Sequence, residues 1–206
     1  MSFYWSKERA KNCARNAPHR EIEKLTAKKR LPIGGQAPDF DLPGVDGKHL
    51  SLAGLPDKKI VVVVFTCNHC PYVQAYESRL IAIQRDYASR GVTLVAINAN
   101  ETRNYPEDNF PEMIKRARAQ GYNFPYLRDE TQVTANAYGA HYTPEVFLLD
   151  QARRLRYTGR IDDNWQHPER VTSQDLREAL DAVLSGRAVN NPETHAMGCT
   201  IKWAEI

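Results

Sequence analysis

The feature that most constrains the fold is an apolar run that ends at two closely spaced cysteines. Residues 60–65 are β-branched or aromatic, and the chain then reads Thr66-Cys67-Asn68-His69-Cys70-Pro71. An apolar run without alternation is typical of a strand covered on both faces in the centre of an α/β sheet. Apolar residues then recur at steps of three and four, which predicts an amphipathic helix to about residue 91. The cysteine pair therefore lies where a buried strand passes into a helix.

Cys67 and Cys70 are predicted to form a redox-active dithiol, supported by Asn68 and His69 between them. The free N–H groups and the dipole at the helix start favour an anion, so we expect a lowered pKa for the Cys67 thiol. Cys67 would then attack a substrate disulfide, and Cys70, one helical turn later, would resolve the mixed disulfide. A cationic His69 would favour the thiolate further. Pro71 suits the first helical turn, where its missing N–H costs little.

Other uses of the cysteine pair fit less well. Haem attachment needs a histidine directly after the second cysteine, and Pro71 occupies that position. A structural zinc site needs four ligands, whereas the other two thiols, Cys13 and Cys199, are isolated in the sequence. Two buried structural cysteines remain as the plain alternative. The sequence therefore predicts neither a metal nor another cofactor.

Charge is distributed unevenly along the 206 residues. Residues 1–31 contain nine Lys and Arg against three Asp and Glu, so the rest of the chain carries a net charge of −3. A mildly acidic body lacks the basic stripe of a nucleic-acid-binding domain. No apolar run approaches the length of a membrane span, and the N-terminus lacks the apolar region of a secretory signal. We expect a cytoplasmic location, with an exported form left open, no nucleic-acid partner and no membrane span.

The chain is expected to form one domain with two extensions. Residues 1–31 are a basic N-terminal extension, either a solvated arm or a docking arm for a partner or an anionic surface. Residues 32–187 form the domain, because the apolar content of the chain suffices for one core. Residues 188–206 are a C-terminal tail that packs on the domain. Near the start of the domain, Asp46-Gly47 between two short alternating runs predicts a β-hairpin.

Strands and helices are predicted to alternate after the cysteine pair. A strand at 92–98 is joined to the first strand through the helix, which is long enough for a right-handed parallel crossover. The polar, turn-rich residues 98–111 are expected to form a loop that lines the site. In the last helix, Thr172 or Ser173 is the expected N-cap and Gly186 the expected end. The remaining elements are helices at 113–121, 131–138 and 175–184, and strands at 124–127, 145–150 and 154–161.

This order of elements resembles the thioredoxin fold, and more narrowly its redoxin branch, known as AhpC/TSA or peroxiredoxin-like. The resemblance spans about residues 31–203 and implies a three-layer α/β/α domain with a mixed central sheet and an N-terminal β-hairpin extension. The motifs that carry it are Ala37-Pro38-Asp39-Phe40, Asp46-Gly47, residues 65–73, 96–100, 124–127 and 138–140, Thr143-Pro144, and Gly198-Cys199-Thr200-Ile201-Lys202-Trp203.

The resemblance also implies a role for Thr143-Pro144. This pair corresponds to the cis-proline site of the family, whose loop packs against the cysteine pair and offers backbone groups to an extended substrate. Proline base rates alone would favour a trans bond at the start of a strand. A true peroxiredoxin places threonine three residues before its reactive cysteine, whereas Val64 precedes Cys67 and Cys67 precedes Cys70 at that spacing. Peroxidase activity is therefore the weaker implication.

The predicted function is a thiol–disulfide oxidoreductase acting on protein or small-molecule thiols and disulfides, with an unidentified reductant. One alternative is a peroxiredoxin-like antioxidant peroxidase. Another is a copper-binding thioredoxin-fold chaperone, with Cys67, Cys70 and His141 as ligands. Cys199 is either a structural residue that packs with Ile201 and Trp203 or a third redox thiol, and the sequence alone favours the structural role.

Overall fold

The computed structural model describes residues 30–205, so Cys13 and almost all of the basic extension lie outside it. The first two described residues, Arg30 and Leu31, contact the domain. The Arg30 guanidinium forms an ion pair with Glu145 at 2.5 Å. Leu31 is buried in the core and donates its N–H to the carbonyl oxygen of Tyr138. The last two residues assigned to the extension thus pack on the domain.

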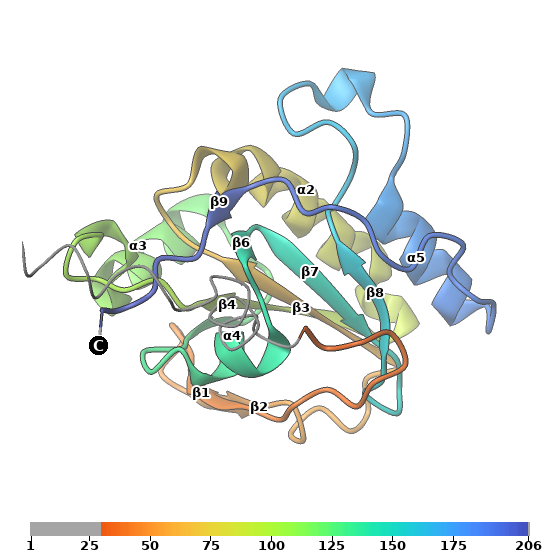
Figure 1. Cartoon of the computed structure of the whole chain (residues 1–206), viewed down its shortest axis with the longest axis horizontal. Helices are drawn as coiled ribbons and strands as arrows, with labels where there is room; N and C mark the ends of the chain where they lie inside the picture. Colours follow the sequence, from red (N-terminus) through yellow and green to blue (C-terminus); the bar gives the residue numbers. More distant parts are fainter. Residues whose placement is uncertain (1–29, 206) are drawn as a thin grey trace, which may run out of the picture.

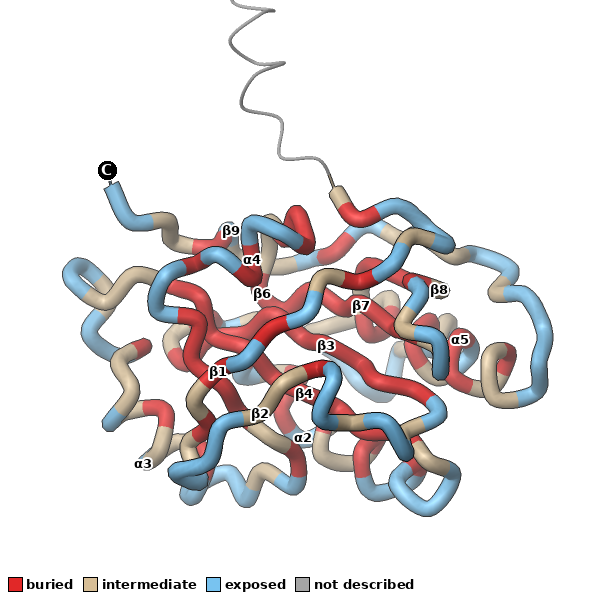
Figure 2. Tube along the Cα trace, turned by 90° about the horizontal axis from the view of Figure 1, so that it is seen from below, coloured by how far each residue is buried: buried red, intermediate tan, exposed pale blue. Residues whose placement is uncertain are grey.

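A mixed five-stranded sheet forms the centre of the molecule, in the order β5-β4-β3-β7-β8 (Figure 1). β3 runs parallel to β4, and β4 runs parallel to β5. β7 pairs antiparallel with β3, and β8 pairs antiparallel with β7. All seven residues of β3 are buried, as its unalternating apolar sequence predicts, and Figure 2 shows the buried strands at the centre of the trace. The strands are β3 Ile60–Thr66, β4 Val92–Asn98, β5 Tyr126–Arg128, β7 Glu145–Leu149 and β8 Leu155–Gly159.

Helices and a hairpin cover the two faces of this sheet. Val62 and Val64 of β3 pack with α2 (Pro71–Tyr87), α3 (Phe110–Gln120) and α5 (Asp175–Leu184). Successive side chains of a strand point to opposite faces. Val61 and Val63 accordingly pack on the other side, with α4 (Val133–Tyr138) and the antiparallel hairpin β1–β2 (Asp41–Pro43, His49–Ser51). These three layers are the thioredoxin fold with its N-terminal hairpin, as predicted from the sequence.

One predicted helix cap is wrong. The N-cap of α5 is Gln174, which makes no capping hydrogen bond with its side chain. Thr172 instead bonds to Asp163 through both its N–H and its hydroxyl, because that carboxylate lies across the preceding turn. Gly186 follows the helix with φ of +69°, as its predicted role at the end of the helix requires.

The C-terminal tail crosses the domain after α5 and returns to the end of the sheet where the cysteine pair lies (Figure 1). There β9 (Cys199–Thr200) pairs antiparallel with β6 (Tyr142–Thr143), and Thr143 lies opposite Cys199. The described part of the chain also contains three 3-10 turns, η2 Ala88–Arg90, η3 Pro106–Asp108 and η4 Pro168–Arg170. Within residues 30–205, no helix has the length and apolar character needed to cross a membrane.

Candidate active site

The cysteine pair occupies the turn between β3 and α2. Cys67 follows the last residue of β3, and Cys70 is the N-cap of α2, which begins at Pro71. The start of α2 therefore lies next to Cys70, and the Val73 backbone contributes to the lowered pKa of that thiol. This differs from the sequence-based expectation, which placed Cys67 at the helix end and Cys70 a full turn inside the helix.

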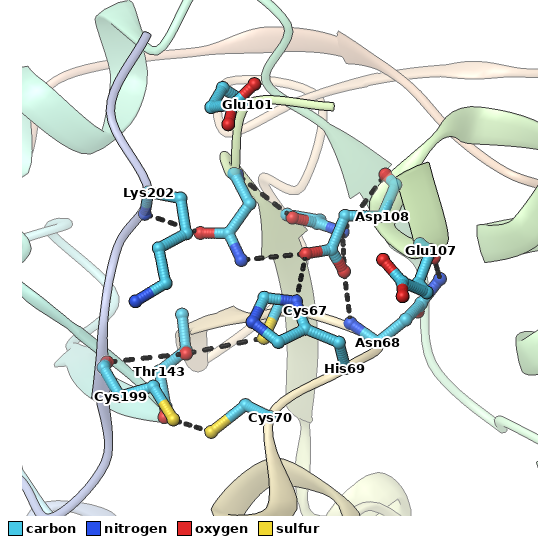
Figure 3. Close-up of polar contacts among 12 residues, drawn as sticks. Cys67, Asn68, His69, Cys70, Glu101, Glu107, Asp108, Thr143, Cys199 and Lys202 are labelled. Carbon is cyan, nitrogen blue, oxygen red and sulfur yellow. Dashed lines mark hydrogen bonds and ion pairs between the residues drawn. The ribbon is translucent and has the colours of Figure 1, made fainter. Parts of the chain in front are cut away.

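Three sulfur atoms meet at this turn. The Cys70 sulfur is hydrogen-bonded to the side chains of both Cys67 and Cys199, so it stands between the other two. Cys67 and Cys70 are only 1% and 0% exposed, whereas Cys199 is half-buried. The three pack in one small cluster with Val73 and Tyr72. Figure 3 shows the three cysteines close to Thr143. The structure therefore brings together a pair adjacent in sequence and a thiol that lies far from it.

The pKa values of the two thiols of the pair are shifted in opposite directions. Hydrogen bonding from Cys67, with smaller contributions from Cys199 and the Val73 backbone, lowers the pKa of Cys70 to about 4 in spite of its burial. The pKa of Cys67 is raised far above its ordinary value by the same Cys70 hydrogen bond, by burial and by the charge of Asp108. These opposite shifts favour the negative charge on Cys70. The predicted lowered pKa of Cys67 is wrong, because the Cys70 hydrogen bond, burial and the Asp108 charge all raise it.

Thr143-Pro144 forms the opposite wall of the site, and its peptide bond is cis as predicted. The Thr143 hydroxyl oxygen lies 3.4 Å from the Cys67 sulfur. The Thr143 carbonyl oxygen lies 3.3 Å from the Cys70 sulfur and accepts its hydrogen bond when that thiol is protonated. The Thr143 residue therefore contacts both sulfur atoms of the pair.

Asp108, from η3 in the loop after β4, fixes the turn that carries the cysteines. Its fully buried carboxylate accepts hydrogen bonds from the Asn68 N–H at 2.5 Å and from His69 Nδ1 at 2.6 Å. The side-chain amides of Asn98 and Asn100 donate to the same carboxylate at 3.2 and 2.8 Å. Four donors therefore satisfy the oxygens of this buried carboxylate. Asp108 therefore both orients the turn and places a negative charge next to Cys67.

Asn68 and His69 line the turn as predicted, but both face the loop after β4. The Asn68 amide donates to the carbonyl oxygen of Glu107 at 2.6 Å, and its oxygen accepts from the Tyr126 hydroxyl at 2.9 Å. The His69 ring stacks on Tyr105, with ring centroids 4.9 Å apart. A groove of about 500 Å³ opens beside Asn68 and His69, with the charged side chains of α3 on its far side. These contacts hold the turn rigid and leave a polar surface beside it.

The copper ligand set considered from the sequence is not assembled. Among residues 30–205, the group whose ligand atoms lie within 4.8 Å of one another is Cys67, His69 and Asp108. The His141 ring lies beside Tyr142 instead, and its carbonyl oxygen accepts from the N–H of Ile201. Both oxygens of Asp108 already accept hydrogen bonds, so the group that does assemble is a hydrogen-bonded one.

The C-terminal tail forms the cover of the site. Gly198 lies so close to the cis-proline loop that a Cβ atom there would clash with the Thr143 carbonyl oxygen. The Lys202 N–H donates to the Asn100 side chain at 2.9 Å, which joins the tail to the loop after β4. The expected packing of Cys199 with Ile201 and Trp203 is wrong, because those two side chains join the core on the hairpin face of the sheet. Cys199 packs instead with Cys67, Cys70 and Val73.

Sequence reasoning missed Asp108 and its amide partners. The polar composition of residues 98–111 predicted a loop at the site, and Asp108 belongs to that loop. Several acidic and amide residues occur there, however, and only the folded backbone selects Asp108 as the buried one. The sequence signal that comes nearest to identifying Asp108 is the pair Asn98 and Asn100 at the end of β4. Both amides are buried, and buried amides need hydrogen-bond partners.

Residues 33–158 match the AhpC/TSA family over well more than half of the chain. The chain belongs to the AhpC/TSA family. It is 26% identical to the thiol-disulfide oxidoreductase ResA of Geobacillus thermodenitrificans over 163 residues, which are 77% of this chain and 82% of ResA. It is also 26% identical to a putative peroxiredoxin of Mycobacterium tuberculosis over 141 residues, which are 68% of this chain and 84% of that protein.

A solved structure extends this similarity to almost the whole described fold. The crystal structure of a hypothetical protein from Sinorhizobium meliloti is 40% identical to this AhpC/TSA protein, with a TM-score of 0.80. The match covers 85% of this chain and 97% of the other. The similarity therefore includes residues well beyond the 33–158 segment that matches the family.

Proposed function

We propose that this AhpC/TSA protein is a thiol–disulfide oxidoreductase that works through a Cys67–Cys70 dithiol–disulfide couple. The observation that carries the proposal is the packed pair of buried thiols at the start of α2, whose pKa values are shifted in opposite directions. A thiolate is the nucleophile in thiol–disulfide exchange, and a second thiol in contact with it can close the reaction. The name of the relative ResA supports the same reaction class.

The position of the charge favours an order of attack that is the reverse of the one predicted from spacing. The Cys70 thiolate attacks one sulfur of a substrate disulfide, which forms a mixed disulfide and releases the other substrate sulfur as a thiolate that takes up a proton. Cys67 then gives up its proton and attacks the Cys70 sulfur. The Cys67–Cys70 disulfide forms, and the second substrate thiol leaves with a proton. The protein dithiol has lost two electrons and the substrate disulfide has gained them.

Asp108 and Thr143 position the reacting sulfurs in this scheme. While Cys67 carries its proton, the Asp108 charge keeps it protonated and leaves Cys70 as the thiolate. Once Cys70 is bound in a mixed disulfide, it no longer accepts the hydrogen bond that contributes most to the raised pKa of Cys67. Cys67 therefore becomes easier to ionise at the step in which it must attack. The Thr143 hydroxyl, 3.4 Å away, lowers its pKa further.

Trapping with oxidised glutathione tests this proposal. All proteins carry Cys13→Ser and Cys199→Ser, which leaves the couple as the only source of thiols. We expect Cys67→Ser to accumulate a dithiothreitol-sensitive adduct of one glutathione, read by intact mass, and Cys70→Ser to accumulate none. An adduct on the Cys70→Ser protein alone would restore Cys67 as the attacking sulfur. Absence of adducts from both, with no Cys67–Cys70 disulfide in the parent protein, would overturn the function.

A peroxidase is a second candidate, because Cys70 combines a lowered pKa with a position directly before Pro71 at the helix start. The thiolate would attack a peroxide oxygen, giving a sulfenic acid and releasing water or an alcohol. The Cys67 thiol would then condense with it, giving the same disulfide and water. The relative named as a putative peroxiredoxin supports this candidate. Hydrogen peroxide consumption in the presence of dithiothreitol tests it, and loss in Cys70→Ser is the expected result.

A further inference from the structure

Cys199 lies in a position that packing alone does not require. Its side chain hydrogen-bonds to Cys70, and burial together with that contact raises its own pKa to about 11. The tail that carries it is held on both sides of Cys199. Gly198 abuts the Thr143 carbonyl, and Ile201 donates its N–H to the carbonyl oxygen of His141 at 2.9 Å. The chain thus holds a third thiol against the charged sulfur of the couple.

β9 also occupies an edge that suits a substrate. Proteins commonly bind an extended peptide by adding it as a strand to an open backbone edge. Here the backbone of β6, directly before the cis-proline, pairs with the tail of the same chain. The residue opposite Thr143 in this pairing is Cys199. The tail therefore lies across the site as a bound peptide would, with a cysteine next to Cys70.

We propose that Cys199 is a third redox thiol, which exchanges with Cys70 and carries the disulfide from the buried couple to the surface of the protein. This inference rests on the proposed function of the Cys67–Cys70 couple. In the exchange, the Cys199 sulfur attacks the Cys70 sulfur of the Cys67–Cys70 disulfide. A Cys70–Cys199 disulfide forms, Cys67 leaves as a thiolate, and the proton lost by Cys199 passes to Cys67. The exchange involves no net oxidation or reduction.

The exchange would move the disulfide from two buried cysteines to one that is more exposed. Cys67 and Cys70 are almost completely buried, so an external reductant reaches the disulfide between them less readily than it reaches Cys199. Cys199 is half-buried and lies on a two-residue edge strand. A dithiol reductant can attack the Cys199 sulfur of the Cys70–Cys199 disulfide, releasing Cys70 as the thiolate. Its second thiol then frees Cys199 and leaves the reductant as a disulfide.

Disulfide mapping tests the pairing directly. The full chain with Cys13→Ser and Cys67→Ser is oxidised with diamide, quenched in acid, alkylated and mapped by mass spectrometry without reduction. We expect an intramolecular Cys70–Cys199 disulfide in the monomer. The chain with Cys13→Ser alone should yield both the Cys67–Cys70 and the Cys70–Cys199 linkages. Free thiols or intermolecular disulfides alone in the first protein, together with the Cys67–Cys70 linkage alone in the second, would overturn the proposal.

Two further readouts separate this inference from the proposed function. The chain with Cys13→Ser and Cys199→Ser should still form the Cys67–Cys70 disulfide, and failure here would count against the couple itself. Its reduction by dithiothreitol should be slowed by about tenfold or more relative to Cys13→Ser, since the exposed sulfur is lost. In the Cys67→Ser protein that keeps Cys199, Cys199 should resolve the glutathione adduct on Cys70. Less adduct should therefore accumulate in this protein than in the protein that carries both Cys67→Ser and Cys199→Ser. Equal reduction rates and equal adduct levels would show that Cys199 only packs.

Discussion

The two cysteines of the site are three residues apart and face opposite electrostatic environments. The pKa of Cys67 is raised by its hydrogen bond to Cys70, by burial and by the Asp108 carboxylate in the loop after β4. The pKa of Cys70 is lowered by the same bond to Cys67 and, to a smaller extent, by Cys199 in the C-terminal tail and the Val73 backbone at the start of α2. The Cys-X-X-Cys spacing is the same for both sulfurs. The comparison teaches that the contact between the thiols, together with the elements packed on each side of the turn, decides which thiol is the more acidic.

Removal of the charge on the Cys67 side should have the largest effect. We expect Asp108→Asn to lower the pKa of Cys67 and to destabilise the protein by about 3 kcal/mol, because an amide cannot accept all the hydrogen bonds that the buried carboxylate accepts. Urea unfolding measures the stability, and iodoacetamide labelling of Cys67 over a pH series reports the pKa. Glu107→Gln is the matched control, since it removes the neighbouring, exposed carboxylate. Equal effects from the two variants would contradict the role given to Asp108.

Displacement of the tail should have an intermediate effect on the Cys70 side. In Gly198→Ala, the new Cβ would clash with the Thr143 carbonyl, so β9 must move away from β6. We expect a loss of about 1–2 kcal/mol from this overpacking. Labelling of Cys70 should become faster because its cover is displaced.

A second glycine supplies the control for that variant. Gly186 has φ of +69°, and no atom lies within 4 Å of the position that a Cβ would take there, so Gly186→Ala strains the backbone without a clash. It should lower stability and leave Cys70 labelling unchanged. Unchanged Cys70 labelling in Gly198→Ala would mean that the tail does not cover the site.

Removal of the Lys202 charge on the C-terminal tail should have the smallest effect on thiol reactivity. The Lys202 ammonium lies 5.5 Å from the Tyr105 ring centroid and lowers the pKa of Cys199. In Lys202→Gln, that pKa should rise, so alkylation of Cys199 should slow by less than about threefold at low salt. Added salt should remove the difference, because this charge is partly exposed. Lys115→Gln, which removes an exposed lysine of α3, is the control.

Much of the fold follows from local sequence. The apolar run at residues 60–65, Pro71 at a helix start and Asp46-Gly47 in a hairpin each specify their structure through neighbouring residues. The last helix shows where such reasoning fails, because Asp163 takes Thr172 as a partner and removes it from the expected cap. Helix caps depend on which polar groups the folded chain brings close.

The composition of the site depends on contacts between distant segments. The two cysteines and the cis-proline could be identified from motifs, since each motif is contiguous. The position of Asp108 depends on its loop folding over the turn, with its carboxylate 40 residues from the Asn68 N–H that it binds. Cys199 reaches Cys70 only because β9 pairs with β6. The direction of the pKa shifts follows from these contacts, so spacing alone assigned the charge to the other sulfur.

The central claim, that the resting charge lies on Cys70, is tested most directly by a thiolate absorbance titration near 240 nm of the reduced protein. All variants carry Cys13→Ser so that only the three thiols of the site contribute. We expect one thiolate with a pKa near 4 that disappears in Cys70→Ser and persists at neutral pH in Cys67→Ser, with its midpoint moved upward by the loss of the Cys67 thiol. A thiolate that survives Cys70→Ser and disappears in Cys67→Ser would place the charge on Cys67 and contradict the account.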